Sequence, residues 1–223
     1  EKHDAELVEH AKKMTEYAFD SLHFTSELGT DITVGLVKDH IWAGGNGCTQ
    51  SGILFDPNIP TEEIFCMPDN TRINGTVYAS KPLLFSGKRI ENFHLTFKDG
   101  KVVDYDAEKG KETLKQLLET DEGSVSLGEV ALVPYDSPVS KMNILFCDTL
   151  YDENAACHLA LGACYPENLK GGLEMSEEEL SAHHGNISAI HEDFMFGTAE
   201  LNVDGIKEDG TVIPVFRHGN FVI

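Results

Sequence analysis

Residues 152–165 read DENAACHLALGACY, a run of small and apolar residues that opens on acidic and polar ones. Asp152 or Asn154 suits the N-cap of a helix, because a side-chain oxygen there accepts from free backbone N–H groups. Alanine and leucine favour helix over the residues that follow. Pro166 disfavours helical geometry at the residue before it. The stretch therefore predicts a helix that ends at Tyr165.

This predicted helix would place His158 and Tyr165 on one face, because the two residues are seven positions apart. If Asn154 is the cap, Glu153 lies just outside the helix and can turn toward His158. An imidazole and a phenol on one face are typical of the wall of a binding or catalytic site. The same pattern also fits a hydrogen-bonded histidine and a half-buried tyrosine with no function, so other segments must decide.

The chain is strongly acidic. Its 223 residues include 17 lysines and arginines against 38 aspartates and glutamates, and the net charge is −21. This charge argues against nucleic acid and anionic membrane surfaces as partners. It suits divalent cations, cationic amine substrates or simply a solvated acidic surface. Five cysteines without a CxxC pair favour a reducing compartment. Because no apolar stretch is long enough for a bilayer, we expect a cytoplasmic protein.

Local patterns predict both helices and hairpins. Apolar residues at helical spacing predict an amphipathic helix over residues 4–22, through Leu7, Ala11, Met14, Ala18 and Leu22. A chain that opens directly in such a helix is typical of a piece that begins inside a larger protein. The clearest hairpin covers residues 88–106, where Asp99-Gly100 suits a two-residue type I′ turn.

The remaining segments mix the two types of element. Strands are predicted at residues 30–36, 75–79, 126–134, 143–147 and 187–196, helices at residues 107–119 and 176–182, and turns at Asp204-Gly205 and Asp209-Gly210. Hairpins are present and regular βαβ alternation is missing. We therefore expect an α+β fold with a mixed, largely antiparallel sheet and packed helices.

Glu129 stands inside the apolar strand LGEVALVP of residues 127–134. Burying a bare carboxylate costs on the order of tens of kcal/mol in the idealised limit, unless it is paired or binds a metal. The chain has few positive side chains to pair with it, so a metal ion is the simplest partner. The alternative is a partly exposed glutamate on an edge strand.

Further candidate ligands lie in two other segments. His191 and Asp193 are two residues apart in a predicted strand, so both point to one face and Glu192 points to the other. Imidazole with carboxylates suits zinc, and also cobalt or manganese. The pair Glu62-Glu63 fits an exposed acidic turn, the first turn of a helix, or one carboxylate at a metal with its neighbour behind it.

Two histidines and four carboxylates are more than one tetrahedral ion requires. They match a two-metal site, in which a bridging carboxylate holds ions about 3.5–4 Å apart and a shared water is activated. A nearby Tyr165 hydroxyl could then stabilise the oxyanion of the tetrahedral intermediate. The candidate ligands are Glu63, Glu129, Glu153, His158, His191 and Asp193.

Four motifs in order resemble the thermophilic-type metalloaminopeptidases, the family of aminopeptidase T, aminopeptidase S and PepS. They are NIPTEE at residues 58–63, LGEVALVP at 127–134, LYDENAACHLALG at 150–162 and HEDFMFG at 191–197. The resemblance extends from residue 30 to the C-terminus. It implies that the six candidates are metal ligands, with Glu63 rather than Glu62, that Glu129 bridges, and that Glu129 and Tyr165 are catalytic.

The resemblance also implies an additional N-terminal α/β domain that is missing here. Residues 1–223 would then be the C-terminal catalytic, metal-binding domain of a two-domain metallopeptidase, and the full-length parent would be a homodimer. The implied enzyme removes N-terminal amino acids from peptides by attack of metal-activated water. Its cofactor would be one or two divalent ions of zinc, cobalt, magnesium or manganese. The alternative is a truncated fragment, or an acidic domain that binds metal structurally without turnover.

Overall fold

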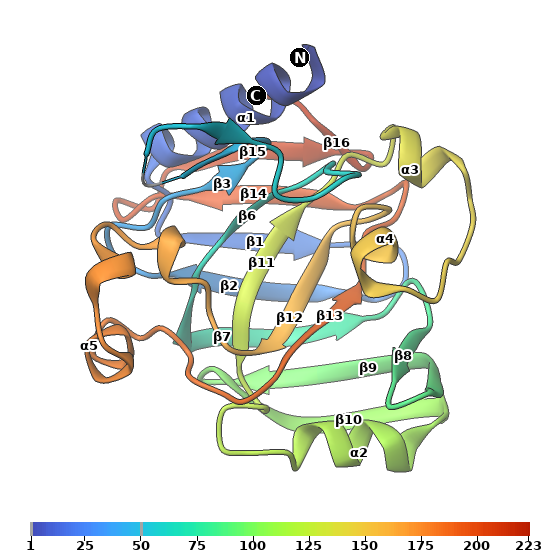
Figure 1. The fold of residues 1–223 in the computed structure, drawn as a ribbon. Coiled ribbons are helices and arrows are strands. Elements are labelled where there is room, and N and C mark those ends of the chain that lie inside the picture. Colours follow the sequence, from blue (N-terminus) through green and yellow to red (C-terminus); the bar gives the residue numbers. More distant parts are fainter. Residues whose placement is uncertain (1, 50) are drawn as a thin grey trace.

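Two antiparallel sheets, one large and one small, form the body of the protein. The computed structural model describes residues 2–49 and 51–223. In Figure 1 the strands β11, β12 and β13 of the small sheet run across the front of β1, β2 and β7 of the large one. The strand order of the large sheet is β10-β9-β7-β2-β1-β14-β15-β16, with β8 paired to β9. That of the small sheet is β13-β12-β11-β6-β3. The expected α+β class with antiparallel sheets is confirmed.

The large sheet has nine strands. They are β1 (Ser21–Thr25), β2 (Asp31–Leu36), β7 (Pro68–Tyr78), β8 (Leu83–Phe85), β9 (Lys88–Lys98), β10 (Lys101–Lys109), β14 (Asn202–Ile206), β15 (Val212–Arg217) and β16 (Asn220–Phe221). The hairpin prediction is confirmed: β9 and β10 pair around Asp99 (φ 48°) and Gly100 (φ 86°). Two positive φ values are what a type I′ turn needs, and glycine adopts them at no steric cost.

The small sheet consists of β3 (Ala43–Gly44), β6 (Ile64–Cys66), β11 (Leu127–Leu132), β12 (His158–Gly162) and β13 (His191–Met195). A separate two-stranded ribbon, β4 (Gly47–Cys48) with β5 (Leu54–Phe55), lies between β3 and β6 in the chain.

The main core fills the space between the two sheets. Phe93 of β9 packs against Phe194 of β13 with ring centroids 5.8 Å apart. Phe24 of β1 meets Phe196, just beyond β13, edge to face at 5.3 Å. Since side chains alternate along a strand, the neighbours of the core residues on β11, β12 and β13 project to the other face of the small sheet.

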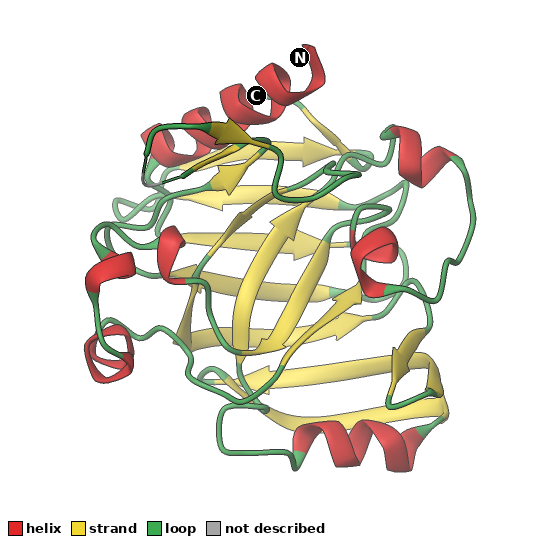
Figure 2. Ribbon diagram, in the orientation of Figure 1, coloured by secondary structure: helices red, strands yellow, loops and turns green. Residues whose placement is uncertain are grey.

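Helices lie at the periphery of the two sheets (Figure 2). They are α1 (Lys2–Tyr17), α2 (Lys111–Leu118), α3 (Pro138–Lys141), α4 (Thr149–Glu153) and α5 (Glu177–Ala182), with short 3₁₀ turns η1 (Pro166–Asn168) and η2 (Gly172–Glu174). The N-terminal helix prediction is confirmed as far as Tyr17: Leu7, Ala11 and Met14 are buried. No described helix is long and apolar enough to span a membrane.

Residues 152–165 do not form a helix, and this prediction is wrong. After α4 ends at Glu153, the chain turns and enters β12, which pairs with β11 on one side and β13 on the other. All five residues of β12 are buried. Pairing on both edges and burial of both faces override the helical preference of alanine and leucine. His158 and Tyr165 therefore do not share a helical face.

Two smaller predictions are also wrong. Residues 143–147 form neither helix nor strand, and Ile144 is exposed. Asp204-Gly205 lies inside β14 rather than in a turn. Gly205 is instead a close packing position, where a Cβ atom would fall 2.4 Å from the ring of Phe19. Asp209-Gly210 does lie in a turn, between β14 and β15.

Candidate metal centre

The register of the small sheet places polar side chains in a row on the face away from the main core. Glu129 of β11 pairs with Ala160 of β12, and Ala160 pairs with Asp193 of β13. Directly paired residues share a face of the sheet. The small Ala160 side chain leaves the space between the two carboxylates free.

His158 enters this row from the start of β12. Its Nε2 atom lies 2.9 Å from Oε2 of Glu63, 3.4 Å from Oε1 of Glu129 and 4.0 Å from Oδ1 of Asp193. Glu63 immediately precedes β6, which pairs with the opposite edge of β11. Four segments far apart in the sequence thus converge on one imidazole nitrogen.

His191 occupies a second corner of the same site. Its Nε2 atom lies 3.3 Å from Oε2 of Glu129 and 3.5 Å from Oδ1 of Asp193. The fold thus brings the candidate ligands Glu129 and His191 together. The two carboxylate oxygens of Glu129 face different histidines, so this residue belongs to two groups of possible ligands: Glu63, Glu129 and His158, and Glu129, His191 and Asp193.

Both histidines are oriented by backbone carbonyls. Nδ1 of His158 lies 3.1 Å from the carbonyl oxygen of Ala156, and Nδ1 of His191 lies 2.7 Å from that of Ala163. A carbonyl oxygen only accepts, so each Nδ1 donates its proton there. The neutral imidazoles then direct their Nε2 lone pairs at the carboxylates. This arrangement needs a cation, and it is the usual orientation of a metal-binding histidine.

The titration behaviour of the metal-free site reflects this need for a cation. Burial alone would lower the pKa of His191, but the adjacent Asp193 and Glu129 carboxylates raise it to about 11. The pKa of His158 is likewise held well above its usual range, against burial, by Glu129 and Glu63. Protons on the two imidazoles thus supply positive charge among the carboxylates.

Glu153 extends the cluster from the end of α4. Burial, together with the negative charges of Glu63 and Asp193, raises the pKa of Glu153 to about 9. Its side chain lines a cleft of about 280 Å³ that Glu63, Glu129, His191 and Asp193 also line. All six candidate ligands therefore lie together.

Tyr165 lies on the rim of the same cleft. Its ring centroid is 4.5 Å from that of His191 and 5.7 Å from that of Phe65. The side chain is 40% exposed, so its phenol remains accessible from the cleft. Burial of the remainder and the nearby carboxylates, Glu129 first among them, raise the pKa of the phenol, which therefore stays protonated and able to donate. Pairing of β12 with β13, rather than a helix, brings Tyr165 to this place.

Glu62, the alternative to Glu63, faces away from the cluster. Its carboxylate lies 3.3 Å from Nε2 of His3 on α1. It is not among the residues that line the cleft. The geometry thus favours Glu63 as the member of the pair at the site.

The opposite wall of the cleft was not predicted from the sequence. It consists of the glycine-rich residues 43–47 together with Pro57, Asn58 and Thr61, and Glu167 lies on the rim beside Tyr165. The available signal was the glycine-rich turn itself, since glycines let a backbone approach a ligand closely. The sequence offered nothing to connect that turn with the four motifs.

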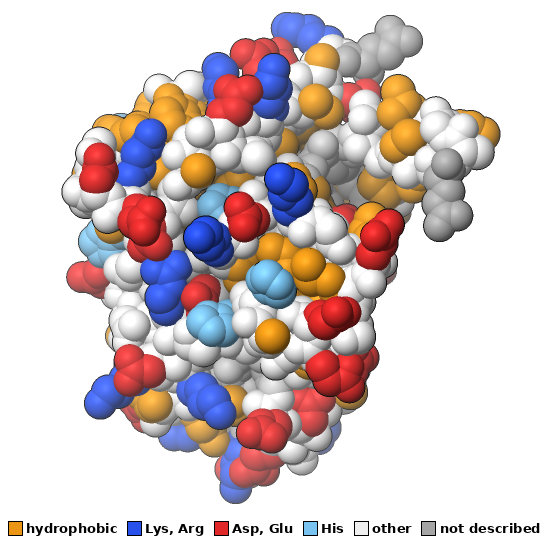
Figure 3. All heavy atoms as spheres, turned by 90° about the vertical axis from the view of Figure 1, so that its left-hand side faces the viewer, with side chains coloured by type: hydrophobic (Ala, Val, Ile, Leu, Met, Phe, Trp, Pro, Cys, Tyr) orange, Lys and Arg blue, Asp and Glu red, His pale blue; other side chains and the backbone are white. Residues whose placement is uncertain are grey.

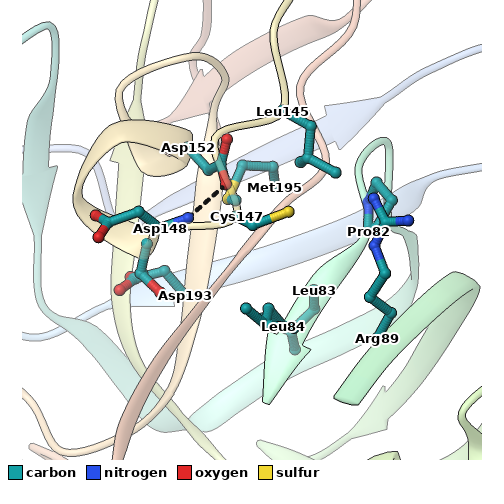
Figure 4. A pocket seen from close by; sticks show the side chains of 11 residues that line it. Pro82, Leu83, Leu84, Arg89, Leu145, Cys147, Asp148, Asp152, Asp193 and Met195 are labelled. Atoms are coloured by element: carbon teal, nitrogen blue, oxygen red, sulfur yellow. Dashed lines mark hydrogen bonds between the residues drawn. The ribbon is translucent and has the colours of Figure 1, made fainter. Parts of the chain in front are cut away.

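A small recess lies on the other side of Asp193 (Figure 4). Its volume is about 40 Å³, and it is lined by Leu83, Leu84, Met195 and the loop around Cys147. Asp152 accepts hydrogen bonds there from the N–H groups of Phe146 (2.8 Å) and Asp148 (3.2 Å). The recess is too small for a peptide.

The residues of the cluster fit a divalent metal. Oε2 of Glu63 is buried, and among the described residues its polar neighbour is Nε2 of His158, 2.9 Å away, a position that a metal ion could share. Among the described residues that line the cleft there is no lysine or arginine to neutralise the carboxylates. Two imidazoles with carboxylates are a donor set for zinc, cobalt or manganese.

Comparison with known proteins supports the same chemistry. The family profile described as "Thermophilic metalloprotease (M29)" matches residues 1–221. Aminopeptidase 2 of Geobacillus stearothermophilus is 56% identical over 193 residues, which cover 86% of this chain and 47% of that protein. Aminopeptidase AmpS of Bacillus subtilis is 50% identical over 219 residues, or 98% of this chain and 53% of that protein. The structure of wild-type AmpT from Thermus thermophilus matches with a TM-score of 0.94 at 45% identity, over 100% of this chain and 54% of that one. The chain thus spans about half the length of these relatives.

Proposed function

The chain belongs to the thermophilic metalloprotease (M29) family, and from this premise we propose that it is a metalloaminopeptidase that removes N-terminal amino acids from peptides. One observation carries the proposal. Glu129, buried in the middle of a strand, directs one carboxylate oxygen at each of two histidines. That is the arrangement expected of a carboxylate that bridges two metal positions.

The proposed metal ligands are Glu63, Glu129, Glu153, His158, His191 and Asp193. A divalent ion bound there supplies Lewis acidity, which lowers the pKa of water and polarises a carbonyl group. The backbone contacts of the two histidines keep their Nε2 atoms unprotonated once a metal replaces the protons of the metal-free site. Zinc, cobalt and manganese fit these ligands best, and magnesium fits the carboxylates alone.

The acidic cleft suits the substrate's free N-terminus. A peptide enters an aminopeptidase with its α-ammonium group first, and this group carries a positive charge at neutral pH. No lysine or arginine among the described lining residues opposes it, and Glu167 lies on the rim. Carboxylates left over from metal binding can therefore hold the ammonium group and orient the first peptide bond.

Tyr165 is the proposed donor to the developing oxyanion. Its phenol is accessible, and its raised pKa keeps the proton in place at neutral pH. Contact with the His191 ring holds the aromatic side chain beside the metal ligands without making it one. A hydrogen bond that strengthens as charge develops on the carbonyl oxygen accelerates the chemical step.

A catalytic site is favoured over a structural metal site by its openness. Structural sites are closed by protein ligands, whereas catalytic sites keep a position for water and substrate. Here the ligand cluster borders a cleft of about 280 Å³. That volume has room for a substrate residue beside the ions.

We extend the proposal to the whole protein. Residues 1–223 would be the C-terminal metal-binding portion of a two-domain, cytoplasmic homodimer that acts on peptides and not on nucleic acid or membranes. The length of the relatives supports a larger protein. Exposed apolar side chains support a partner surface: Ile53 is 63%, Leu54 67% and Ile59 77% exposed. Figure 3 shows hydrophobic side chains gathered on the lobe that projects at the upper right.

The experiment combines metal analysis with an assay on amino-acid p-nitroanilides, with and without added Zn²⁺ or Co²⁺. We expect one or two ions per chain and hydrolysis that requires a free α-amino group. Asp193→Asn should lose both metal and activity. Glu192→Gln, the adjacent residue on the opposite face of β13, should keep them. Metal binding without hydrolysis, or equal hydrolysis of N-acetylated substrates, would overturn the proposed function.

A further inference from the structure

Asn154 is a buried amide that joins two segments of the site. Its side chain is completely inaccessible to solvent. Oδ1 accepts a hydrogen bond from the backbone N–H of Glu62 at 2.7 Å, across 92 positions of the chain. Nδ2 donates to the carbonyl oxygen of Leu150 at 2.7 Å. Both contacts are short and well within hydrogen-bonding range.

The two joined segments carry two of the proposed ligands. Glu63 follows Glu62 directly, and Glu153 precedes Asn154 directly. One amide group therefore sets the separation between the backbone that bears Glu63 and the backbone that bears Glu153. His158, four residues further along, is the first residue of β12 and is itself a third proposed ligand.

The segment around Asn154 is held at its start by Asp152, which accepts from the N–H groups of Phe146 and Asp148, and at its end by the Asn154 amide. Helix α4 has only five residues, and a helix of this length does not persist without tertiary contacts. Asn154 is its C-cap, and the bond to Leu150 satisfies a carbonyl that a short helix leaves free. At the other end, the Asp148 N-cap makes no side-chain capping bond. The amide thus fixes the end of the helix from which Glu153 projects.

We propose that Asn154 is a positioning residue that holds Glu63 and Glu153 at the separation the metal centre requires. It touches neither substrate nor metal and acts through the two backbone segments. The inference rests on the proposed function, because it assigns Asn154 to the same metal site.

Zn²⁺ affinity, measured by competition with a chromophoric chelator well below the melting temperature, tests the proposal. Asn154→Ala should weaken Zn²⁺ binding by about 10–100-fold, the usual scale for residues that orient ligands. Asn154→Asp keeps the acceptor for the Glu62 N–H group but loses the donor to the Leu150 carbonyl, so its affinity should lie between those of wild type and Asn154→Ala. If Asn154→Ala does not fold, Asn154→Ser, which is too short to reach both partners, takes its place with the same expectation.

Ser124→Ala is the matched control. Ser124 is also fully buried, and its hydroxyl joins the backbone of Leu118 and Asp121, with no contact to a ligand segment. It should lose stability and keep its Zn²⁺ affinity. The inference fails if Asn154→Ala binds Zn²⁺ as tightly as wild type, or if Asn154→Asp is as weak as Asn154→Ala. Failure of wild type itself to bind Zn²⁺ would instead reject the proposed function.

Discussion

The two sheets of this protein differ in how far apart in the sequence their paired strands lie. The large sheet consists mainly of hairpins, such as β9 with β10 around Asp99-Gly100, although β1 pairs with β14 and β2 with β7 across long stretches of the chain. The small sheet joins β6, β11, β12 and β13, which come from four separate parts of the chain. Local turn chemistry therefore accounts for most pairings of the large sheet, while every pairing of the small sheet joins strands far apart in the sequence.

The sheets also differ in what they bury. The large sheet contributes apolar side chains to the core, whereas the small sheet buries charge: Glu129 is 3% and His158 1% exposed. Buried charges without partners destabilise a fold by several kcal/mol each. The small sheet thus contains buried negative charge that a bound metal ion would neutralise. The apolar packing contributed by the large sheet stabilises the fold against the cost of burying that charge. The following predictions test this division of roles.

The largest effect is expected from Glu129→Gln. The amide cannot offer an anionic oxygen to each histidine, so we expect lower metal stoichiometry and a loss of kcat/KM of about 10³-fold or more, corresponding to several kcal/mol. Metal analysis and p-nitroanilide kinetics on the same preparation provide the measurement. Full activity at full metal occupancy would contradict a bridging role.

Tyr165→Phe should come next. It removes the proposed oxyanion donor and leaves the ring packing on His191 and Phe65 unchanged. We expect kcat to fall by about 10²–10³-fold with metal content, KM and melting temperature nearly unchanged. If kcat is unchanged while the melting temperature falls, Tyr165 is a packing residue only.

Gly100→Ala probes the scaffold instead of the site. The substitution places a Cβ atom 1.7 Å from the backbone oxygen of Asn70, at a φ of 86°. The backbone has to move, and we expect a loss of about 3 kcal/mol or more in the free energy of unfolding. Gly87→Ala is the matched control, because Gly87 has a similar φ of 73° but nothing within 4 Å of the added atom. It should lose only about 1 kcal/mol. Chemical denaturation measures both, and equal losses would mean that close approach plays no part.

The last prediction concerns how the stability of the metal-free protein depends on pH. The pKa of Glu153 is raised to about 9 in the folded chain. A raised pKa means that the folded state holds its proton more tightly than the unfolded state does. Its contribution to stability is thus complete below about pH 4.5 and is lost as the pH rises toward 9.

We therefore expect the melting temperature of EDTA-treated protein to fall between pH 5 and 9, by about 2–4 °C for each kcal/mol lost. His191 contributes to this fall in the same direction, because its pKa is raised to about 11. Glu153→Gln should remove the contribution of Glu153 to this fall, so the melting temperature should decrease less with pH. Bound Zn²⁺ should make the melting temperature nearly independent of pH over this range. A variant with the same slope as wild type would show that Glu153 is not forced to share the site with other carboxylates.

Much of the scaffold was predictable because its signals are local. The spacing of Leu7, Ala11 and Met14 predicted α1, and Asp99-Gly100 predicted the β9–β10 hairpin. The helix prediction for residues 152–165 was wrong because long-range pairing, not a local signal, determines the structure there. Alanine and leucine carry a helical preference of less than 1 kcal/mol each, and pairing β12 on both edges outweighs it.

The composition of the site was predictable although its construction was not. A carboxylate in an apolar strand and a histidine and an aspartate two residues apart indicated a metal centre, because buried charge requires a partner. The predicted reason for Tyr165, a shared helical face with His158, was wrong. Sheet register places His158 among the buried carboxylates, and Tyr165, which follows β12 in the chain, lines the cleft.

By itself the sequence determined which side chains are the candidate ligands and that the fold is α+β, because residue type and local spacing are written directly in it. The tertiary structure alone decided that Ala160 separates Glu129 from Asp193, that Glu63 rather than Glu62 faces the site, and that Asn154 joins the two backbone segments. Each of these depends on which strands meet and in what register. A shift of one residue would turn every side chain of a strand to the other face, and pairing across dozens of residues is settled only when the whole core packs.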